Sequence, residues 1–132
     1  MSTSSFRHIT SRTDQDVLVL TIVDNRLWDE KPCAELRNEL IAAVAETGAK
    51  KIVLDMSNVE SVSSVAFRPL LSLRRVVEDS GARMVLCGLS ELVAEVFHAT
   101  RLLISGHSSV APFEARPDLP SALASFRQPK TR

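Results

Sequence analysis

The chain has 132 residues, of which 45% are hydrophobic and 24% are charged, a length that predicts one domain able to fold without a metal or disulfide. Lys plus Arg and Asp plus Glu number 16 each, so no overall basic excess favours nucleic acid or anionic lipid. We therefore expect a protein or small-molecule partner and no nucleic acid.

The first half of the chain predicts a hairpin, a helix and a buried strand. Residues 6–12 alternate and residues 16–24 form an apolar run, with turn residues between them, which indicates two paired strands. Residues 33–48 show helical spacing, behind a proline tolerated in an opening turn and ending at a glycine. Residues 50–57 form a continuous apolar strand, typical of the centre of a sheet.

The second half alternates helices and strands. The spacing predicts a helix from near Ser64 to about Asp79, a strand over 83–89, a helix over 91–102, a short strand over 102–105 and a closing helix over 117–126. Strands that alternate with helices imply parallel crossovers, and the opening hairpin makes the sheet mixed. The predicted fold class is a single α/β domain with a mixed, mostly parallel sheet of about four to five strands and about four helices.

Two local features refine these helices. Pro69 falls in the second turn of the helix expected after Ser64, where proline removes one hydrogen bond and disfavours a helical Arg68. We therefore expect a distorted first turn or a late helix start. The helix over 91–102 is expected to carry one apolar face, formed by Leu92, Val93, Val96 and Phe97.

The cysteines and histidines are not spaced as metal ligands. Cys33 and Cys87 lie far apart in different predicted elements, which favours two reduced, buried thiols. His8, His98 and His107 lack the spacing of three or four residues that places two imidazoles on one helix face. We expect no metal site and no cofactor.

No targeting or membrane-spanning signal is visible. The longest apolar runs are much shorter than the roughly 20 residues that cross a bilayer, and the first ten residues hold no apolar signal-peptide core. We expect a cytoplasmic protein without direct membrane insertion. Residues 1–132 are expected to form the single domain, ordered over about 6–126 with short frayed ends.

In a sheet of this type the functional surface lies where strands end and the following helices begin. Three loops fit this description: residues 24–32, 57–64 and 88–91. Ser64 lies at the expected start of a helix, where its hydroxyl can cap free N–H groups. The same position can accept a phosphate, because the amino end of a helix attracts an anion. The residue pattern leaves both roles open.

Residues 50–89 resemble the STAS family, the domain of bacterial anti-sigma factor antagonists. Residues 97–103 resemble the segment that follows in that family. The resemblance covers about residues 6–126 and is strongest over residues 52–103. It implies a STAS-like fold for the predicted α/β domain.

The resemblance also implies a phosphorylation site. In the family pattern an Asp-x-Ser after the central strand is followed by Asp-Ser-Ser/Thr-Gly, whose first serine accepts phosphate. Asp55 and Ser57 match the first part, and Ser64 falls on the phosphoacceptor. Ser63 stands in place of the aspartate and is the weaker alternative acceptor.

Two further positions depart from the pattern: Val65 replaces the second hydroxyl residue and Ala66 replaces the glycine. Loss of the aspartate removes a charge beside the acceptor and can alter how a kinase recognises the phosphorylation site. Ser64 remains the expected phosphoacceptor, and a domain that keeps the fold without the switch is the alternative.

The partner interface implied by the resemblance includes Ser63, Ser64 and a loop aspartate that Asp29 matches. Asp29 has a second interpretation, as a capping or turn residue near the helix start. Trp28 is a candidate anchor for a partner, with a half-buried loop tryptophan as the alternative. Arg68 is a candidate for this interface and for binding an anion, against the alternative of a solvated helix face.

By this resemblance we expect an anti-sigma factor antagonist, a non-catalytic partner-switching module. The unphosphorylated protein would bind an anti-sigma factor and serine kinase of the HATPase type, phosphorylation of Ser64 would break that complex, and a PP2C-type phosphatase would restore it. The alternative is a non-phosphorylated STAS scaffold within a larger regulatory or membrane-associated complex. Weak homo-oligomerisation stays open.

A response-regulator receiver is a third hypothesis, because Asp55 ends a central strand where receivers carry their acceptor aspartate. Neither residues 10–16 nor residues 102–109 supply the acidic pair and the lysine that a receiver needs. We therefore expect Asp55 to bond backbone groups of the following loop. The sequence contains no nucleophile elbow and no Gly-rich phosphate loop, so we do not expect an enzyme.

Overall fold

The structure, a computed structural model, describes residues 6–99 and 113–127. Five of the strands in this part of the chain form one sheet, in the order β1-β2-β4-β6-β7. They are Ile9–Asp14 (β1), Val17–Ile22 (β2), Lys51–Asp55 (β4), Arg83–Cys87 (β6) and Glu114–Arg116 (β7). β1 and β2 are antiparallel and the other neighbours are parallel, so the predicted mixed, mostly parallel sheet is confirmed.

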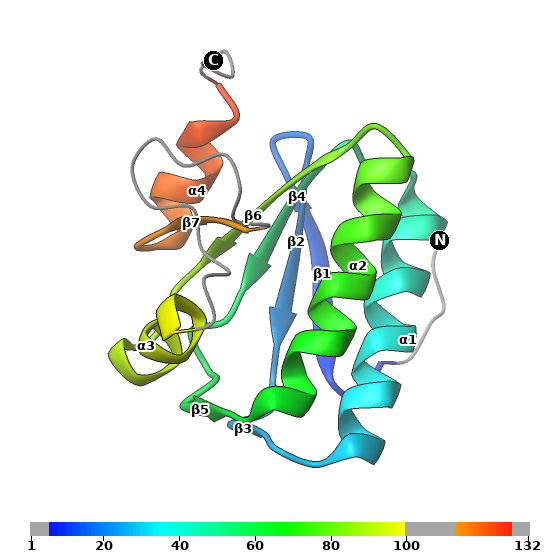
Figure 1. Cartoon of the computed structure of the whole chain (residues 1–132). Coiled ribbons are helices and arrows are strands. Elements are labelled where there is room, and N and C mark those ends of the chain that lie inside the picture. The colour runs from blue at the N-terminus through cyan, green and yellow to red at the C-terminus, as the bar shows by residue number, and fades with distance from the viewer. Residues whose placement is uncertain (1–5, 100–112, 128–132) are drawn as a thin grey trace.

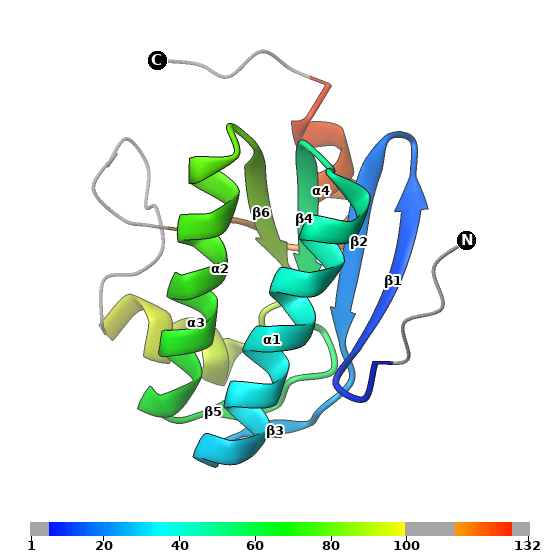
Figure 2. The ribbon, with the colours of Figure 1, turned by 90° about the vertical axis from the view of Figure 1, so that its right-hand side faces the viewer.

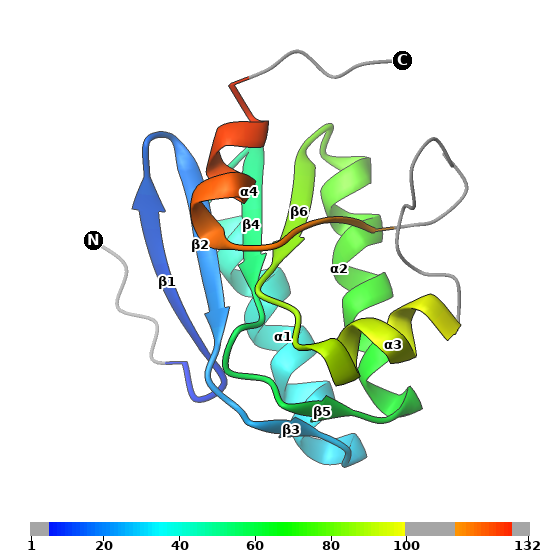
Figure 3. The ribbon, with the colours of Figure 1, turned by 90° about the vertical axis from the view of Figure 1, so that its left-hand side faces the viewer.

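Helices cover both faces of this sheet (Figure 1). They are Glu30–Thr47 (α1), Phe67–Asp79 (α2), Glu91–Ala99 (α3) and Leu119–Ser125 (α4), with a 3₁₀ turn (η1) at Ser64–Ala66. α1 and α2 lie side by side on one face (Figure 2), and α4 lies on the other (Figure 3). The predicted α/β class is confirmed. None of the described helices is long and apolar enough to cross a membrane.

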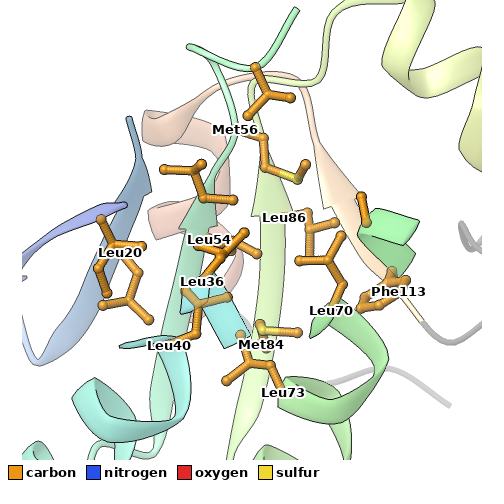
Figure 4. Packing of buried hydrophobic residues seen from close by; sticks show 14 of the residues in the cluster. Leu20, Leu36, Leu40, Leu54, Met56, Leu70, Leu73, Met84, Leu86 and Phe113 are labelled. Carbon is orange, nitrogen blue, oxygen red and sulfur yellow. The ribbon is translucent and has the colours of Figure 1, made fainter. Parts of the chain in front are cut away.

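The larger core lies between the sheet and the helices α1 and α2 (Figure 4). The strand register places Leu20, Leu54 and Leu86 in one row across three neighbouring strands. Because side chains alternate along a strand, the whole row points toward the helices. There it meets buried leucines of both helices: Leu36, Leu40, Leu70 and Leu73. Burial of each such side chain contributes about 1.5–3 kcal/mol to stability.

A smaller core lies on the opposite face, beneath α4. Valines of β2, β4 and β6 pack there against Ala122. The guanidinium of Arg83 donates to the carboxylate of Glu114 and to the carbonyl oxygen of Ser125, and it lies 5.0 Å from the centre of the Phe126 ring. A charged side chain therefore helps to hold β7 and α4 to β6.

The start of α2 confirms the effect expected of Pro69. The 3₁₀ turn η1 comes first, and the α-helix begins only at Phe67. Pro69 is thus the third residue of α2, where its missing N–H is one of the four that have no acceptor within a helix. The late start places proline where its cost is small.

Two regions expected to be loops contain short strands. Arg26–Leu27 (β3) and Ser61–Val62 (β5) pair in parallel as a second, two-stranded sheet. Strands of two residues are too short to show the alternation by which sequence patterns indicate a strand. Their partner residues lie far apart in the chain, so the pairing depends on the fold around them.

The chain differs from the sequence-based expectation at two further points. α1 begins at Glu30, three residues before the predicted start, because the extended backbone ends at Asp29. The pattern does not predict β7, whose three residues are all half-buried. The strand predicted over residues 102–105 lies outside the described residues.

Candidate functional site

The loops that follow β2 and β4 lie side by side and are joined by backbone hydrogen bonds. Glu60 N–H donates to the carbonyl oxygen of Asn25 (2.7 Å), and Ser63 N–H donates to that of Leu27 (3.0 Å). Leu27 and Val62 point into the core, while Arg26 is exposed. We call residues 25–28 and 60–63 the β3–β5 ribbon. It lies at the carboxyl end of the parallel strands, below the sheet in Figure 1.

A tight turn after β4 connects this ribbon to the sheet. An Asp55 carboxylate oxygen accepts a hydrogen bond from Ser57 N–H (2.9 Å), which confirms the structural role predicted for Asp55. Asn58 donates its side-chain amide to the carbonyl oxygen of Ile22 (3.1 Å). Gly88 (φ 73°) lies so close that an added Cβ would be 2.9 Å from Ser57 Cβ. The turn is therefore held from two neighbouring strands.

Both cysteine thiols are buried and free. Burial, with the negative charge of Asp55 as the next cause, raises the pKa of Cys87 to about 12. Burial also raises the pKa of Cys33. A thiol that stays protonated is a poor nucleophile, so neither cysteine belongs to a reactive site.

Ser63 and Ser64 have different surroundings. The half-buried Ser63 donates its hydroxyl to the carbonyl oxygen of Trp28 (3.2 Å) and so links the two strands of the ribbon. Ser64 is exposed, and the part of the chain that the structure describes gives its hydroxyl no hydrogen-bond partner. Of the two serines, only Ser64 presents a hydroxyl that no contact of the described fold occupies.

The prediction that Ser64 caps a helix is wrong. The capping position of η1 is Ser63, whose backbone is extended (ψ 179°), and that of α2 is Ala66; neither makes a side-chain capping bond. A capping residue needs a non-helical backbone, whereas Ser64 already lies inside the 3₁₀ turn. The turn that precedes Pro69 is the physical reason for this shift.

Trp28 and Asp29 stand at the end of the same ribbon. The Trp28 side chain is 51% exposed, and the Arg26 guanidinium lies 5.2 Å from its ring centre. Asp29 occupies the capping position of α1, but its side chain makes no capping hydrogen bond. The capping interpretation of Asp29 therefore holds for its position and not for its carboxylate, which is exposed.

The structure brings most of the predicted interface residues to one end of the molecule. Ser63 is bonded directly to the loop of Trp28, and η1 places Ser64 next in the chain. Arg68 is exposed one turn further on, at the start of α2. α1, which begins just after Asp29, contacts η1.

Sequence reasoning missed two residues at this end. Leu92 was expected on the buried face of α3, but its side chain is 54% exposed, whereas Val93 and Phe97 are buried. A nine-residue helix that packs by one narrow face leaves the neighbouring position outside, and α3 contacts β5 of the ribbon. Arg26 was also missed, although residues two apart on an extended segment share a face, which is how its guanidinium comes to lie over the Trp28 ring.

Known proteins resemble this chain in sequence and in fold. A model of the STAS domain family matches residues 8–111. BtrV of Bordetella bronchiseptica, named as an anti-sigma factor antagonist, is 32% identical over 79 residues. That alignment covers 60% of this chain and 64% of BtrV, so it spans less than two thirds of the relative.

Two solved structures share the architecture. A STAS domain protein from Planctomyces limnophilus has a TM-score of 0.75 at 21% identity, with 91% of this chain and 98% of that chain covered. The anti-sigma factor antagonist SpoIIAA, solved in its unphosphorylated form, has a TM-score of 0.66 at 16% identity, with 90% and 96% covered. At such identities the likeness shows the fold alone. The two structures show that the chain has the fold of anti-sigma factor antagonists, and the family match over residues 8–111 shows that it belongs to the STAS domain family.

Proposed function

We propose that this protein is an anti-sigma factor antagonist that acts as a non-catalytic, partner-switching module in the cytoplasm. Its partner is an anti-sigma factor and serine kinase of the HATPase type, which binds the β3–β5 ribbon and the start of α2. The kinase phosphorylates Ser64, and a PP2C-type phosphatase removes the phosphate. The observation that carries this proposal is the exposed hydroxyl of Ser64, which has no hydrogen-bond partner among the described residues, beside a ribbon in which Ser63 is hydrogen-bonded.

A phosphate on Ser64 is compatible with the fold. The side chain points to solvent, so about two negative charges can be added there without displacing a buried group. In a complex the same charges would meet a close-packed surface, where they cost desolvation and repulsion. Phosphorylation therefore lowers affinity for the partner while the domain stays folded.

The exposed side chains at this end supply contacts for a partner. Trp28 and Leu92 offer apolar area, and Arg26 holds the indole ring from one side. Aromatic side chains of this kind are often the energetic centre of an interface. Asp29 and Arg68 add one exposed charge of each sign near the same end.

The second candidate function is a non-phosphorylated scaffold within a larger regulatory or membrane-associated complex. The residues around Ser64 favour it, because the acidic neighbour expected of the family is replaced by Ser63. In the structure Ser63 has taken a structural role in the ribbon. In a scaffold the exposed Trp28 surface would serve a permanent partner.

Incubation with a serine kinase of the HATPase type from the same organism, ATP and magnesium separates the two candidates. Mass spectrometry is expected to find one phosphate on the wild type and on Ser63→Ala, and none on Ser64→Ala. Absence of phosphate on the wild type, with the kinase active on itself or on another substrate, would favour the scaffold.

A binding assay tests the switch itself. Ser64→Asp is expected to bind the kinase at least about tenfold more weakly than the wild type, a loss of about 1.4 kcal/mol. Ser64→Asn has the same shape without the charge and is the matched control, with affinity close to that of the wild type. Equal affinity of Ser64→Asp and Ser64→Asn would contradict the phosphoswitch.

A further inference from the structure

His8 lies between carboxylates from two other parts of the fold. Its Nδ1 is 2.9 Å from Asp24 Oδ2, and its Nε2 is 2.9 Å from Glu35 Oε1. Asp24 belongs to the loop after β2, and Glu35 belongs to α1. The carboxylate of Glu39, one turn further along α1, accepts hydrogen bonds from the backbone N–H groups of Arg7 and His8.

This geometry requires a doubly protonated ring. A neutral imidazole has one N–H donor and one bare acceptor nitrogen, whereas an imidazolium has two donors. A carboxylate has only acceptor oxygens when it is ionised. Both ring nitrogens of His8 face carboxylate oxygens, so only the imidazolium satisfies both contacts.

The charges that face His8 favour the same state. Burial lowers the pKa of His8, but the hydrogen bonds to Glu35 and Asp24, with the negative charges of Asp24 and Glu39, outweigh burial and leave the pKa above 6.5. The hydrogen bond from His8 lowers the pKa of Glu35, and the positive charges of Arg7 and Lys31 add to that effect.

Val23 and Asp24, which are both bonded to His8, lie directly before the ribbon in the chain. Val23 N–H donates to the carbonyl oxygen of His8 (2.9 Å), and Asp24 follows. Asn25 comes next, and its carbonyl oxygen accepts a hydrogen bond from Glu60 N–H, the first backbone hydrogen bond between the two strands of the β3–β5 ribbon. Figure 2 shows the start of β1 beside the end of β2, near α1.

We propose that His8 is a pH-sensitive clamp that joins the start of β1, the loop of Asp24 and helix α1, and thereby sets the position of the β3–β5 ribbon. When the ring loses a proton it can donate to only one carboxylate, so the loop and α1 are no longer held through the same side chain. The clamp is distinct from phosphorylation of Ser64 and works without a partner.

The clamp stabilises the fold within a defined pH window. Because the folded pKa of His8 lies above its ordinary value of 6.5, the contribution is complete below 6.5 and is lost as the pH rises through the folded pKa. Because the folded pKa of Glu35 lies below its ordinary value of 4.5, its part is present above 4.5 and is lost as the pH falls through the folded pKa. Both contributions are therefore present in full between pH 4.5 and pH 6.5, the ordinary pKa values of Glu35 and His8.

An NMR titration of the whole protein between about pH 5 and 8, the range in which histidine changes charge, tests the clamp. The His8 ring nitrogens are expected to show the imidazolium form with a midpoint above 6.5. The backbone amides of residues 24–28 should follow the same midpoint. A His8 midpoint at or below 6.5, or loop amides that do not follow it, would overturn the proposal.

Three variants sharpen the test. Glu35→Gln keeps His8 and should lower its midpoint by about one pH unit, because one facing charge is removed. His8→Gln should abolish the titration of the loop amides. His98→Gln, at an exposed position of α3, is the matched control and should leave that titration unchanged. If His8→Gln does not fold, Glu35→Gln decides alone, and an unchanged midpoint would contradict the clamp.

Discussion

The row of leucines in the sheet and the β3–β5 ribbon are held together in different ways. Leu20, Leu54 and Leu86 are fully buried in a continuous parallel ladder and covered by two long helices. The ribbon has two paired residues in each strand and two hydrogen bonds from side chains, Ser63 to the Trp28 carbonyl oxygen and Asn25 to Glu60, and its Trp28 is 51% exposed. Regions with few buried contacts open most easily. The core therefore carries the stability of the domain, while the ribbon presents exposed side chains at the surface.

The largest expected effect is a loss of stability when a leucine of the core is truncated. Leu54→Ala should lower the free energy of unfolding by about 3 kcal/mol, because it removes buried methyl groups and leaves a cavity. Urea unfolding followed by Trp28 fluorescence measures the change. Leu92→Ala, at a side chain that is 54% exposed, is the matched control and should change stability by less than about 0.5 kcal/mol.

Partner binding should respond in the opposite order. Leu92→Ala should weaken the complex with the kinase, whereas folded Leu54→Ala protein should bind as the wild type does. Weaker binding by folded Leu54→Ala would show that the core and the ribbon are not separate in function.

The next effect concerns Gly88, where the core and the ribbon meet. Gly88→Ala should cost about 2 kcal/mol or more, because alanine disfavours a positive φ and its Cβ would lie 2.9 Å from Ser57 Cβ. Gly81→Ala is the matched control, since Gly81 has a φ of 76° but no atom within 4 Å of an added Cβ. The difference between the two variants in urea unfolding measures the close contact alone. Equal losses in the free energy of unfolding would show that the turn after β4 can move to make room for the added methyl group at little cost.

A smaller effect is expected inside the ribbon. Ser63→Ala removes the hydrogen bond to the Trp28 carbonyl oxygen and should cost about 0.5–1 kcal/mol. Ser64→Ala removes no hydrogen bond among the described residues and is the control, with stability unchanged. A larger loss for Ser64→Ala than for Ser63→Ala in urea unfolding would reverse the roles assigned to the two serines.

Strand β4 and the helices α1 and α2 were predictable from the sequence because their patterns are long. The continuous apolar run at β4 and the helical spacing of α1 and α2 each reflect burial that repeats over many residues. Pro69 was informative for a local reason, since a proline restricts its own backbone wherever it stands. These elements appear in the structure where the patterns place them, within a few residues.

The ribbon and the His8 clamp were not predictable in this way. Asn25 and Glu60 are bonded across 35 residues of chain, and His8 meets Asp24 and Glu35 only after β1, β2 and α1 have packed. A single histidine carries no spacing signal, so the sequence indicated only that His8 is not spaced as a metal ligand and gave it no further role. Ser64 was found through a family resemblance, whereas its place inside η1 depends on where the 3₁₀ turn begins.

The smallest expected effect is a gain in stability at the end of the molecule far from the ribbon. The hairpin of β1 and β2 turns through Gln15 (φ 51°) and Asp16 (φ 75°), both in the left-handed region that favours glycine. Asp16→Gly should raise the free energy of unfolding by about 0.5 kcal/mol, since relief of this backbone strain is partly offset by the greater freedom of glycine in the unfolded chain. Asp16→Asn, which removes the charge and keeps a side chain at the same φ, is the control for loss of charge. Because the hairpin tip and the ribbon lie at opposite ends of the sheet (Figure 1), kinase affinity should not change, and a change with Asp16→Gly would show that the two ends are coupled through β2.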